Sequence, residues 1–427
     1  MTGLALYRGL TSIATPAVDI LLKRRLARGK EDPDRLPERR GTASRERPPG
    51  PLVWLHAASV GEAQSALSLI ARILDARPEL SILVTTGTVT SARLLADRLP
   101  PRSFHQFVPV DCPSWVGRFF NHWRPDLALW MESELWTNLL GEAAARSVPA
   151  ILINGRMSAR SFDNWRRFSG SARTLLSKFV LCLAQSEEQA ERFRRLQAPA
   201  VDCVGNLKYS AAPLPADDGA LQIHRTALDG RPLWLAASTH PGEEAAAASV
   251  HRQLKDRHPD ILTIIAPRHP ARAPEITEML RGRGLTVMRR SEDPALAGGA
   301  EVYLADTMGE LGLFYRLAPI AFVGGSLSAH GGHNPLEPAQ LGCAVLYGPD
   351  MTNFQTVADA LEQHGGARQC TDIDNLAQTV DMLLNDDIAR QAQIAAAKEI
   401  ADANRRVVDR VYDVLTPHLD RMKERAS

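Results

Sequence analysis

From Leu52 onward, short apolar runs alternate with longer stretches in which apolar residues recur every three or four positions. The first such stretch places Leu67, Ile70, Ala71 and Leu74 on one stripe suited to packing against a sheet. The short runs read LVWLH, SILVTT, LALWM, AILIN, WLAAS, LTIIAP, VYLAD and IAFVGGS. Because short apolar strands that alternate with amphipathic helices are typical of parallel sheets, the pattern predicts an α/β protein.

A stretch poor in strand signals divides this pattern into two similar halves. Residues 209–230 are rich in Pro, Ala, Asp and Gly, so we expect the domain linker there. We assign residues 51–212 to an N-terminal domain and 213–427 to a C-terminal domain, with the option that the last helix packs back on the first domain. Open parallel sheets bind ligands beyond the carboxyl ends of their strands, so two such domains predict a ligand cleft between them.

Residues 1–28 are predicted to associate with a membrane. The first 22 residues are mostly apolar, but Arg8, Pro16 and Asp19 interrupt the run before it reaches the ~20 residues of a spanning helix. A basic cluster follows: Lys23, Arg24, Arg25, Arg28 and Lys30. This order favours an interfacial anchor, with a spanning helix and an ordinary packing helix as the alternatives. Residues 29–50, rich in charge, Pro and Gly, are expected to form a tether.

Charge and cysteine content exclude some classes of function. Fifty Lys and Arg against 49 Asp and Glu leave a net charge of +1 on 427 residues, so no general basic surface exists for a nucleic acid. The five cysteines are scattered and never in C-x-x-C spacing, which indicates neither a disulfide framework nor a zinc site.

Three glutamates stand three positions after a cap-type residue at the end of an apolar run. The pairs are Ser59 with Glu62, Thr307 with Glu310, and Asn334 with Glu337. The spacing is that of a capping box, so a purely structural role is the alternative for each. Their shared place at strand ends, where helix N-termini offer free backbone N–H groups, favours a binding site instead.

The third pair lies in the glycine-rich stretch VGGSLSAHGGHNPLEP, which allows the backbone to approach a ligand and suits a phosphate. His330, His333 and Glu337 suggest a metal, but no third strong ligand stands nearby, so we expect none. The stretch also lacks the spacing of a Rossmann fingerprint or a Walker motif.

Charged residues also follow other apolar runs. Arg268 and His269 follow LTIIAP, where an arginine offers a planar fork to a phosphate, with a solvated loop as the alternative. Glu132 and Glu134 follow LALWM, and Lys208 ends the run VGNLK. Neighbouring carboxylates raise the pKa of one of them, which is useful for proton transfer and also common at helix starts.

Eight motifs, in order, carry a resemblance to a known family: HAASVGE (56–62), MESELWTN (131–138), NGRMSARS (154–161), GNLK (205–208), ASTHPGEE (237–244), PRHP (267–270), DTMGEL (306–311) and GGHNPLEP (331–338). The chain resembles the 3-deoxy-D-manno-octulosonic acid (Kdo) transferases of lipopolysaccharide assembly, from its apolar N-terminus almost to its end. One departure is Thr137, where the family usually has Pro.

The resemblance implies a GT-B fold, in which two Rossmann-like domains face a central cleft. It further implies an inverting glycosyltransferase that moves Kdo from CMP-Kdo to a lipid A precursor (lipid IVA) at the cytoplasmic face of the bacterial inner membrane. No cofactor is expected, because Arg268 and a helix start can neutralise the single phosphate of the leaving CMP without a metal ion.

Residue roles follow from the same resemblance. It makes Glu62 the general base, and Glu132 and Lys208 the groups that stabilise the transition state. Arg156 and Arg160 are candidate contacts to acceptor phosphates, with simple surface arginines as the alternative. The implied CMP contacts are Pro267, Arg268, His269, Met308, Gly309, Glu310, Asn334, Pro335, Leu336 and Glu337.

Two other classes of function share parts of this pattern. Another GT-B nucleotide-sugar enzyme, such as a UDP-sugar transferase or epimerase, has the same alternation, but a diphosphate donor calls for a further basic or glycine-rich cradle. A non-enzymatic, membrane-associated binding protein keeps the fold but has no need of Glu62, Glu132, Lys208 and Arg268 together.

Overall fold

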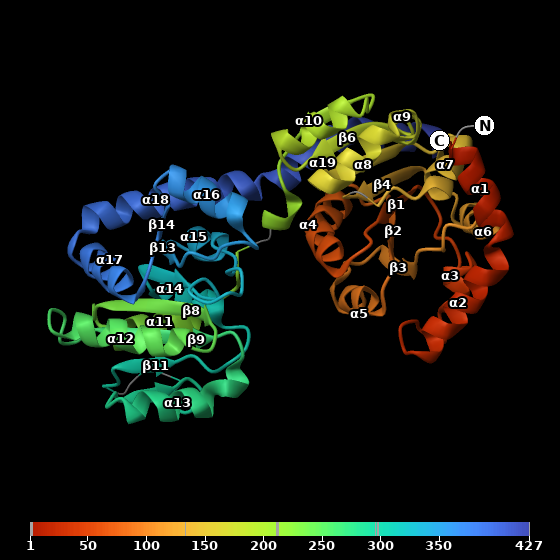
Figure 1. Cartoon of the computed structure of the whole chain (residues 1–427). Coiled ribbons are helices and arrows are strands. Elements are labelled where there is room, and N and C mark those ends of the chain that lie inside the picture. The colour runs from red at the N-terminus through yellow and green to blue at the C-terminus, as the bar shows by residue number, and fades with distance from the viewer. Residues whose placement is uncertain (1–2, 133, 211–212, 295, 297–298, 427) are drawn as a thin grey trace. The chain divides into compact units, whose positions relative to one another are not determined.

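The computed structural model describes residues 3–132, 134–210, 213–294, 296 and 299–426, and it divides into two compact units (Figure 1). The first unit comprises Met1–Ala211 together with Asn404–Ser427, and the second comprises Ala212–Ala403. The expected boundary between residues 212 and 213 touches residues 211–212, which lie outside the described residues. The last helix, α19 (Val407–Ala426), belongs to the first unit.

A seven-stranded parallel sheet forms the centre of the first unit. Its order is β3-β2-β1-β4-β5-β6-β7, so the direction in which strands are added reverses between β1 and β4. The strands are β1 (Leu52–His56), β2 (Ser81–Thr86), β3 (Ser103–Phe107), β4 (Leu127–Met131), β5 (Ala150–Gly155), β6 (Phe179–Ala184) and β7 (Val201–Cys203). Every residue of β1 and β4 is buried, as expected of a sheet covered on both faces.

Helices cover both faces of this sheet. One apolar cluster joins α4, α5 and α19 to one face, and a second joins α6, α7, α9 and α10 to the other. Ile70 of α4 and Val411 of α19 are fully buried in the first cluster, and Phe120 of α6 and Phe193 of α10 in the second. The helices of the unit besides α19 are α1 (Gly3–Ile13), α2 (Thr15–Ala27), α3 (Leu36–Arg39), α4 (Val60–Ala76), α5 (Val89–Arg98), α6 (Pro113–Trp123), α7 (Thr137–Ala145), α8 (Ala159–Arg167), α9 (Ser169–Leu176) and α10 (Glu187–Arg195).

The second unit repeats this plan with a parallel sheet of order β10-β11-β9-β8-β12-β13-β14, whose reversal lies between β8 and β12. Its strands are β8 (Leu233–Thr239), β9 (Leu262–Pro267), β10 (Val287–Arg289), β11 (Val302–Leu304), β12 (Ile320–Val323), β13 (Ala344–Tyr347) and β14 (Ala367–Gln369). Its helices are α11 (Asp218–Leu228), α12 (Glu243–Lys255), α13 (Ala273–Gly282), α14 (Leu311–Leu317), α15 (Leu336–Gln340), α16 (Gln355–Gln363), α17 (Ile373–Asn385) and α18 (Asp387–Arg405). Residues of α12, α13 and α17 pack on one face of the sheet, and residues of α11 and α14 on the other.

The predicted α/β class is confirmed, and each of the eight apolar runs contains a strand. One local expectation is wrong. Residues 209–230 do not form a continuous linker, because α11 occupies Asp218–Leu228 and begins with a cap in which the Asp217 carboxylate accepts from the backbone N–H of Ala220 at 2.7 Å. Leu221 and Leu228 of this helix are buried.

The N-terminal segment forms two helices, α1 and α2, that contact the first unit. The Asn138 side chain donates to Thr11 of α1 at 3.0 Å, and Leu22 of α2 is buried beside Leu36, Cys112 and Trp115. No helix among the described residues is both long and apolar enough to cross a membrane. On α1, however, Leu6, Leu10 and Ile13 have 55%, 58% and 81% of their surface exposed.

Residues 29–50 do not form the expected tether. They include the short helix α3 and pack against β3 through Glu38, whose side chain is fully buried. Its carboxylate accepts hydrogen bonds from Arg35 at 2.9 and 3.0 Å, from Ser44 at 2.5 Å and from the backbone N–H of Phe107 at 2.7 Å. The charges and prolines of this segment therefore serve a fixed local structure.

We expect Glu38→Gln to lower the free energy of unfolding by about 2 kcal/mol, because an amide accepts fewer of these bonds and leaves the Arg35 guanidinium without its charged partner. Urea unfolding monitored by circular dichroism measures this change. Glu46→Gln, an exposed position in the same segment, is the matched control and should be neutral. Equal stability of the two variants would show that Glu38 does not hold this segment in a fixed structure.

Candidate active site

Glu62 lies in the first unit, where the strand order reverses. It stands in the first turn of α4, directly after β1. Ser59 caps this helix by accepting from the backbone N–H of Glu62 at 3.2 Å. The Glu62 carboxylate in turn accepts from the Ser59 hydroxyl at 2.9 Å and from the backbone N–H of Ala58 at 2.8 Å. The predicted capping box is therefore present here, and it fixes the orientation of the carboxylate.

The Glu62 carboxyl group has a strongly raised pKa. Its pKa is raised from 4.5 to about 7, and the burial of the side chain, which has 7% of its surface exposed, is the largest cause. The hydrogen bonds from Ala58 and Ser59 oppose the rise, while the negative charges of Glu132 and Glu134 add to it. A carboxyl group with a pKa near neutrality gains and loses a proton readily at physiological pH, as a general acid or base must.

Glu132 directly follows β4, the strand beside β1, in a strained conformation. Its φ of 52° lies in the left-handed region, while its backbone N–H donates to the carbonyl of Ile153 at 3.1 Å. Burial raises the pKa of the Glu132 carboxyl, and the positive charges of Arg156 and Lys208 lower it. Such strain is tolerated where the surrounding structure enforces it, and it is frequent at functional sites.

Lys208 lies in a 3₁₀ turn, Leu207–Tyr209, that packs against α4. Asn154, which also has a left-handed φ of 53°, accepts from the backbone N–H of Leu207 at 3.0 Å, so the end of β5 holds this turn. The Lys208 side chain is exposed. Because Glu132 interacts electrostatically with both Glu62 and Lys208, the three predicted catalytic residues share one electrostatic environment in this unit.

Arg156 and Arg160 follow β5 and are both exposed. Arg156 acts electrostatically on Glu132 and on the half-buried Tyr209, in each case lowering the pKa of the acidic group. Arg160 lies in the first turn of α8, whose cap is Ser158. Arg156 thus belongs to the environment of the predicted catalytic residues.

The predicted CMP contacts lie in the second unit, where two of their segments line one small hollow of about 120 Å³. Pro267 and Arg268 at the end of β9 form one wall, and Met308 and Gly309 after β11 form another. The Met308 side chain is 75% exposed. The carboxylate of Glu310 is held by Arg290 at 2.6 and 3.0 Å and by the hydroxyl of Thr307, so this side chain has a structural partner already.

The third predicted segment, Asn334–Glu337, lies close enough to Arg268 for the charge of Arg268 to act on Glu337. Burial raises the pKa of the Glu337 carboxyl, while a hydrogen bond from Asn334 and the charge of Arg268 lower it. The Asn334 side chain accepts from the backbone N–H of Leu336 at 3.1 Å and donates to Glu337 at 3.4 Å. Arg268 and Glu337 therefore lie near one another. Pro335 and Leu336, which stand between Asn334 and Glu337 in the sequence, are buried.

Two of the three predicted capping boxes are wrong as helix caps. In the second pair, Glu310 itself is the cap of α14, which begins at Leu311, and Thr307 bonds only to the Glu310 side chain. In the third, the cap of α15 is Pro335 rather than Asn334.

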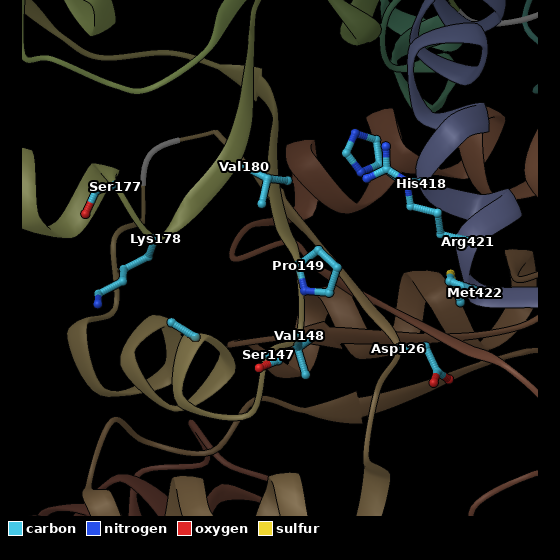
Figure 2. Close-up of a pocket in the computed structure, with 11 residues that line it drawn as sticks. Asp126, Ser147, Val148, Pro149, Ser177, Lys178, Val180, His418, Arg421 and Met422 are labelled. Atoms are coloured by element: carbon cyan, nitrogen blue, oxygen red, sulfur yellow. The ribbon is translucent and has the colours of Figure 1, made fainter. Parts of the chain in front are cut away.

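A separate hollow of about 450 Å³ lies in the first unit at the amino ends of β4, β5 and β6 (Figure 2). Its basic side chains include Lys178, His418 and Arg421. Figure 2 shows the Lys178 ammonium group and the pair His418 and Arg421 on opposite sides of Pro149. The basic groups do not converge on one point, and none of the predicted site residues lines this hollow.

The sequence reading overlooked several groups that build these sites. Asp111 caps α7 from another loop, accepting from the backbone N–H groups of Asn138 at 3.0 Å and Leu139 at 2.8 Å. Glu243 and His240 organise the second unit, and both stand in the quoted motif ASTHPGEE, so a signal for them existed. Among the described residues, His, Cys, Asp and Glu side chains form no group of three arranged to hold a metal ion.

Comparison with known proteins identifies the family. Residues 34–211 match the family model described as 3-deoxy-D-manno-octulosonic-acid transferase (kdotransferase). A relative from Arabidopsis thaliana, named probable 3-deoxy-D-manno-octulosonic acid transferase, mitochondrial, is 35% identical and covers 98% of this chain and 97% of its own. The chain belongs to the Kdo transferase family. A Kdo transferase from Haemophilus influenzae is also 35% identical, with 88% of each chain covered, and the protein is accordingly a glycosyltransferase.

Solved structures show the same fold class. A putative UDP-N-acetylglucosamine 2-epimerase from Listeria monocytogenes has a TM-score of 0.55 at 12% identity, covering 87% of this Kdo transferase and 97% of its own chain. The GT-B arrangement of two Rossmann-like domains is thereby confirmed as the fold class. The C-terminal CMP-Kdo binding domain of WaaA from Acinetobacter baumannii is 33% identical, covers 43% of this chain and 95% of its own, and has a TM-score of 0.41.

We expect Glu62→Gln to stabilise the fold relative to the wild type more at pH 8 than at pH 4. Because the folded-state pKa of Glu62 lies above its unfolded value of 4.5, the wild type loses stability as pH rises from about 4.5 to about 7. This loss is on the order of 3 kcal/mol, and glutamine abolishes it. Urea unfolding at a series of pH values measures the difference between the two proteins.

The matched control is Glu79→Gln, because Glu79 is exposed. Its difference from the wild type should stay constant over this pH range. A constant difference for Glu62→Gln as well would show that burial does not raise the pKa of Glu62.

Proposed function

We propose that this Kdo transferase moves Kdo from CMP-Kdo to a lipid A precursor, lipid IVA, with inversion at the anomeric carbon. The observation that carries the proposal is the buried Glu62 carboxyl, with a pKa of about 7, at the point where the strand order reverses beside Glu132. Ligands of open parallel sheets bind outside the carboxyl ends of the strands at such points. The reaction belongs to lipopolysaccharide biosynthesis.

Glu62 is the general base in this mechanism. In its ionised form it accepts the proton of the acceptor hydroxyl while the hydroxyl oxygen attacks the anomeric carbon of Kdo and the bond to the CMP phosphate breaks. Its hydrogen bonds to Ala58 and Ser59 hold the carboxylate in one orientation, which supports proton transfer in a fixed direction. Direct attack on the opposite side from the leaving group gives inversion.

Glu132 and Lys208 stabilise the charges that develop as this bond breaks. A sugar cation in the transition state is favoured by a carboxylate, and a departing phosphate by an ammonium group. Arg156 moderates the burial effect on Glu132 and keeps the carboxyl more readily ionised. With Arg160 on the next helix, Arg156 also offers an exposed basic pair to the phosphates of the acceptor.

The CMP part of the donor binds in the second unit. Arg268 is exposed beside the hollow formed with Pro267, Met308 and Gly309, which suits an anionic phosphate next to apolar and backbone surfaces. His269, Asn334, Pro335, Leu336 and Glu337 complete the proposed contacts. Because Arg290 holds the side chain of Glu310, the proposed contact of Glu310 with CMP is made by its backbone. The proposal needs no metal ion, since Arg268 supplies the positive charge.

A transfer assay tests this function. The purified protein is incubated with CMP-Kdo and a tetraacylated lipid A precursor, and mass spectrometry counts the sugars added to the lipid. We expect at least one Kdo per acceptor and no transfer from UDP-sugars. A lipid of unchanged mass, with CMP-Kdo intact, would refute the proposed donor and acceptor.

The same assay tests Glu62. We expect Glu62→Gln to lower turnover by roughly 10²-fold or more while CMP affinity changes only a few-fold, because the base is lost and the cap is kept. Wild-type kcat/KM should rise with pH through about 7 as Glu62 ionises, and the variant should lose this rise. Glu79→Gln, on the surface, serves as control. Full turnover in Glu62→Gln would leave this residue a helix cap only.

A lipid acceptor places the reaction at a membrane surface, which we propose is the cytoplasmic face of the bacterial inner membrane. Helix α1 offers the protein an apolar contact to this surface. Leu6, Leu10 and Ile13 recur at helical spacing and are exposed, while Thr11 is bonded to Asn138 of the unit. Within the basic cluster that follows, Lys23 and Arg25 are paired with Asp19 and Glu31, at 3.1 and 2.6 Å. These pairs reduce the charge available to anionic lipids, so we assign the larger share of binding to the apolar residues.

Replacing Leu6, Leu10 and Ile13 together by Gln should weaken binding to vesicles of phosphatidylethanolamine and phosphatidylglycerol at least tenfold, because the apolar contact is removed and helix propensity is kept. Vesicle sedimentation measures the effect. Ile388→Gln is the matched control, because this residue is 85% exposed on α18 of the second unit. Unchanged binding of the triple variant would assign the membrane contact elsewhere.

A further inference from the structure

Two histidines of the second unit contact one another directly. The Nε2 atoms of His240 and His333 are 2.9 Å apart, and their rings are nearly parallel, with centroids 5.2 Å apart. The ring of His330 also stacks on that of His240, and their centroids are 4.1 Å apart. The proposed roles of the CMP-binding residues leave this pair unexplained.

The fold brings these rings together where its strand order reverses. His240 directly follows β8, and His333 stands in the loop that follows β12, the neighbouring strand. Buried Glu243 fixes this geometry, because its carboxylate accepts from the backbone N–H groups of His240 at 2.9 Å and Gly325 at 2.7 Å. Gly325 has a φ of +71°, and a Cβ there would lie 3.3 Å from the His333 ring, so the turn leaves room only for glycine.

The distance between the two Nε2 atoms restricts their protonation. A hydrogen bond between them needs one proton, so one ring donates and the other accepts. A second proton between the rings would set two N–H groups against each other, and therefore the pair can take up a single positive charge at most without separating. That added proton would reside on the outer nitrogen of a ring and be available to a ligand.

Burial above all keeps the pair neutral in the free protein. The pKa of His333 is lowered to about 4, mainly by burial, with smaller contributions from the charges of His240, Arg268, His330 and His269. Burial also lowers the pKa of His240, and Glu243 and Glu244 oppose this effect. The charged groups that face the pair from neighbouring elements are Glu243 and Glu244 of α12, Arg268 and His269 after β9, and His330, which itself lies near Asp350. Arg268 carries the positive charge among these groups, and an anion bound beside it would offset its effect on the pair.

We propose that His240 and His333 form the part of the donor site that takes up a proton: when an anionic group of the donor binds beside Arg268, the pair accepts one proton from solvent and donates a hydrogen bond to that group. The proton returns to solvent when the product leaves. The anionic group is a phosphate or a carboxylate, and CMP-Kdo carries both. This inference rests on the proposed donor and adds two binding residues to it.

Calorimetry of CMP binding at pH 7.5, in buffers with different ionisation enthalpies, counts the protons taken up. We expect the wild type to take up between half a proton and one proton more than either His333→Gln or His240→Gln, because glutamine keeps a hydrogen-bonding amide but does not titrate. The comparison between proteins cancels the ionisation of CMP itself. Cytidine, which lacks the phosphate, should bind without proton uptake, and His364→Gln, an exposed position on the same unit, should behave as the wild type.

The arms of this experiment separate the outcomes. Uptake with CMP assigns the pair to the phosphate, whereas uptake with free Kdo but not with CMP assigns it to the carboxylate. Equal proton counts in the wild type and both variants, with CMP bound, overturn the inference and leave the donor proposal standing. If the wild type binds no CMP, the donor proposal fails and this inference fails with it. Thermal melting of both variants checks their fold, and either variant alone suffices for the comparison.

Discussion

Parallel hydrogen bonding around a reversal of strand order is the constraint on which the rest of this structure depends. In each unit the strands are added in one direction on one side of the reversal and in the other direction on the opposite side. The chain therefore leaves two neighbouring strands, β1 and β4 or β8 and β12, toward opposite faces of the sheet. The opening between these two exits leaves room for side chains that the helices do not cover. Glu62 and Glu132 flank one opening, and His240 and His333 the other.

Buried carboxylates fix the chain where it leaves these strands. The number of hydrogen-bond donors around each carboxylate distinguishes a structural role from a chemical one. Glu243 accepts from four backbone N–H groups, those of His240, Gly325, Ser326 and Leu327, and so satisfies its charge within a turn of the main chain. Glu62 accepts from one backbone N–H and one hydroxyl and has two acidic neighbours. Burial costs the Glu62 side chain the solvation of its charge, and its few hydrogen bonds compensate so little that its pKa rises to about 7.

The periodicity of the sequence predicted the α/β class and the strands in the eight apolar runs, among them the fully buried β1 and β4. It missed β7 and β14 because they are three residues long, partly exposed and polar, and a short edge strand carries little apolar signal. The runs FVLCLA and AVLY of β6 and β13 had the required signal and were overlooked. The helix α11 was mistaken for linker because its apolar residues, such as Leu221 and Leu228, are diluted by polar ones.

For the site, spacing alone identified residues that follow strands, and the resemblance assigned their roles. It could not distinguish a true cap at Ser59 from false ones at Thr307 and Asn334, because α14 begins only after Glu310 and α15 only after Pro335. The contact between His240 and His333 joins residues 93 positions apart. Only the folded sheet brings them together, so no local pattern could predict it. The same holds for Glu38, whose partner Phe107 lies on another element.

The return of the chain to the first unit at Asn404 determines when that unit can be finished. Val411 and Leu415 of α19 are fully buried against α4 and the sheet, and Asp409 pairs with Arg72 of α4 at 2.8 Å. During synthesis, the strands and helices of the first unit leave the ribosome long before α19, and the whole second unit is made in between. The part of this apolar face that α19 covers must therefore stay exposed until α19 has been made, so the first unit closes only after the second unit has been synthesised.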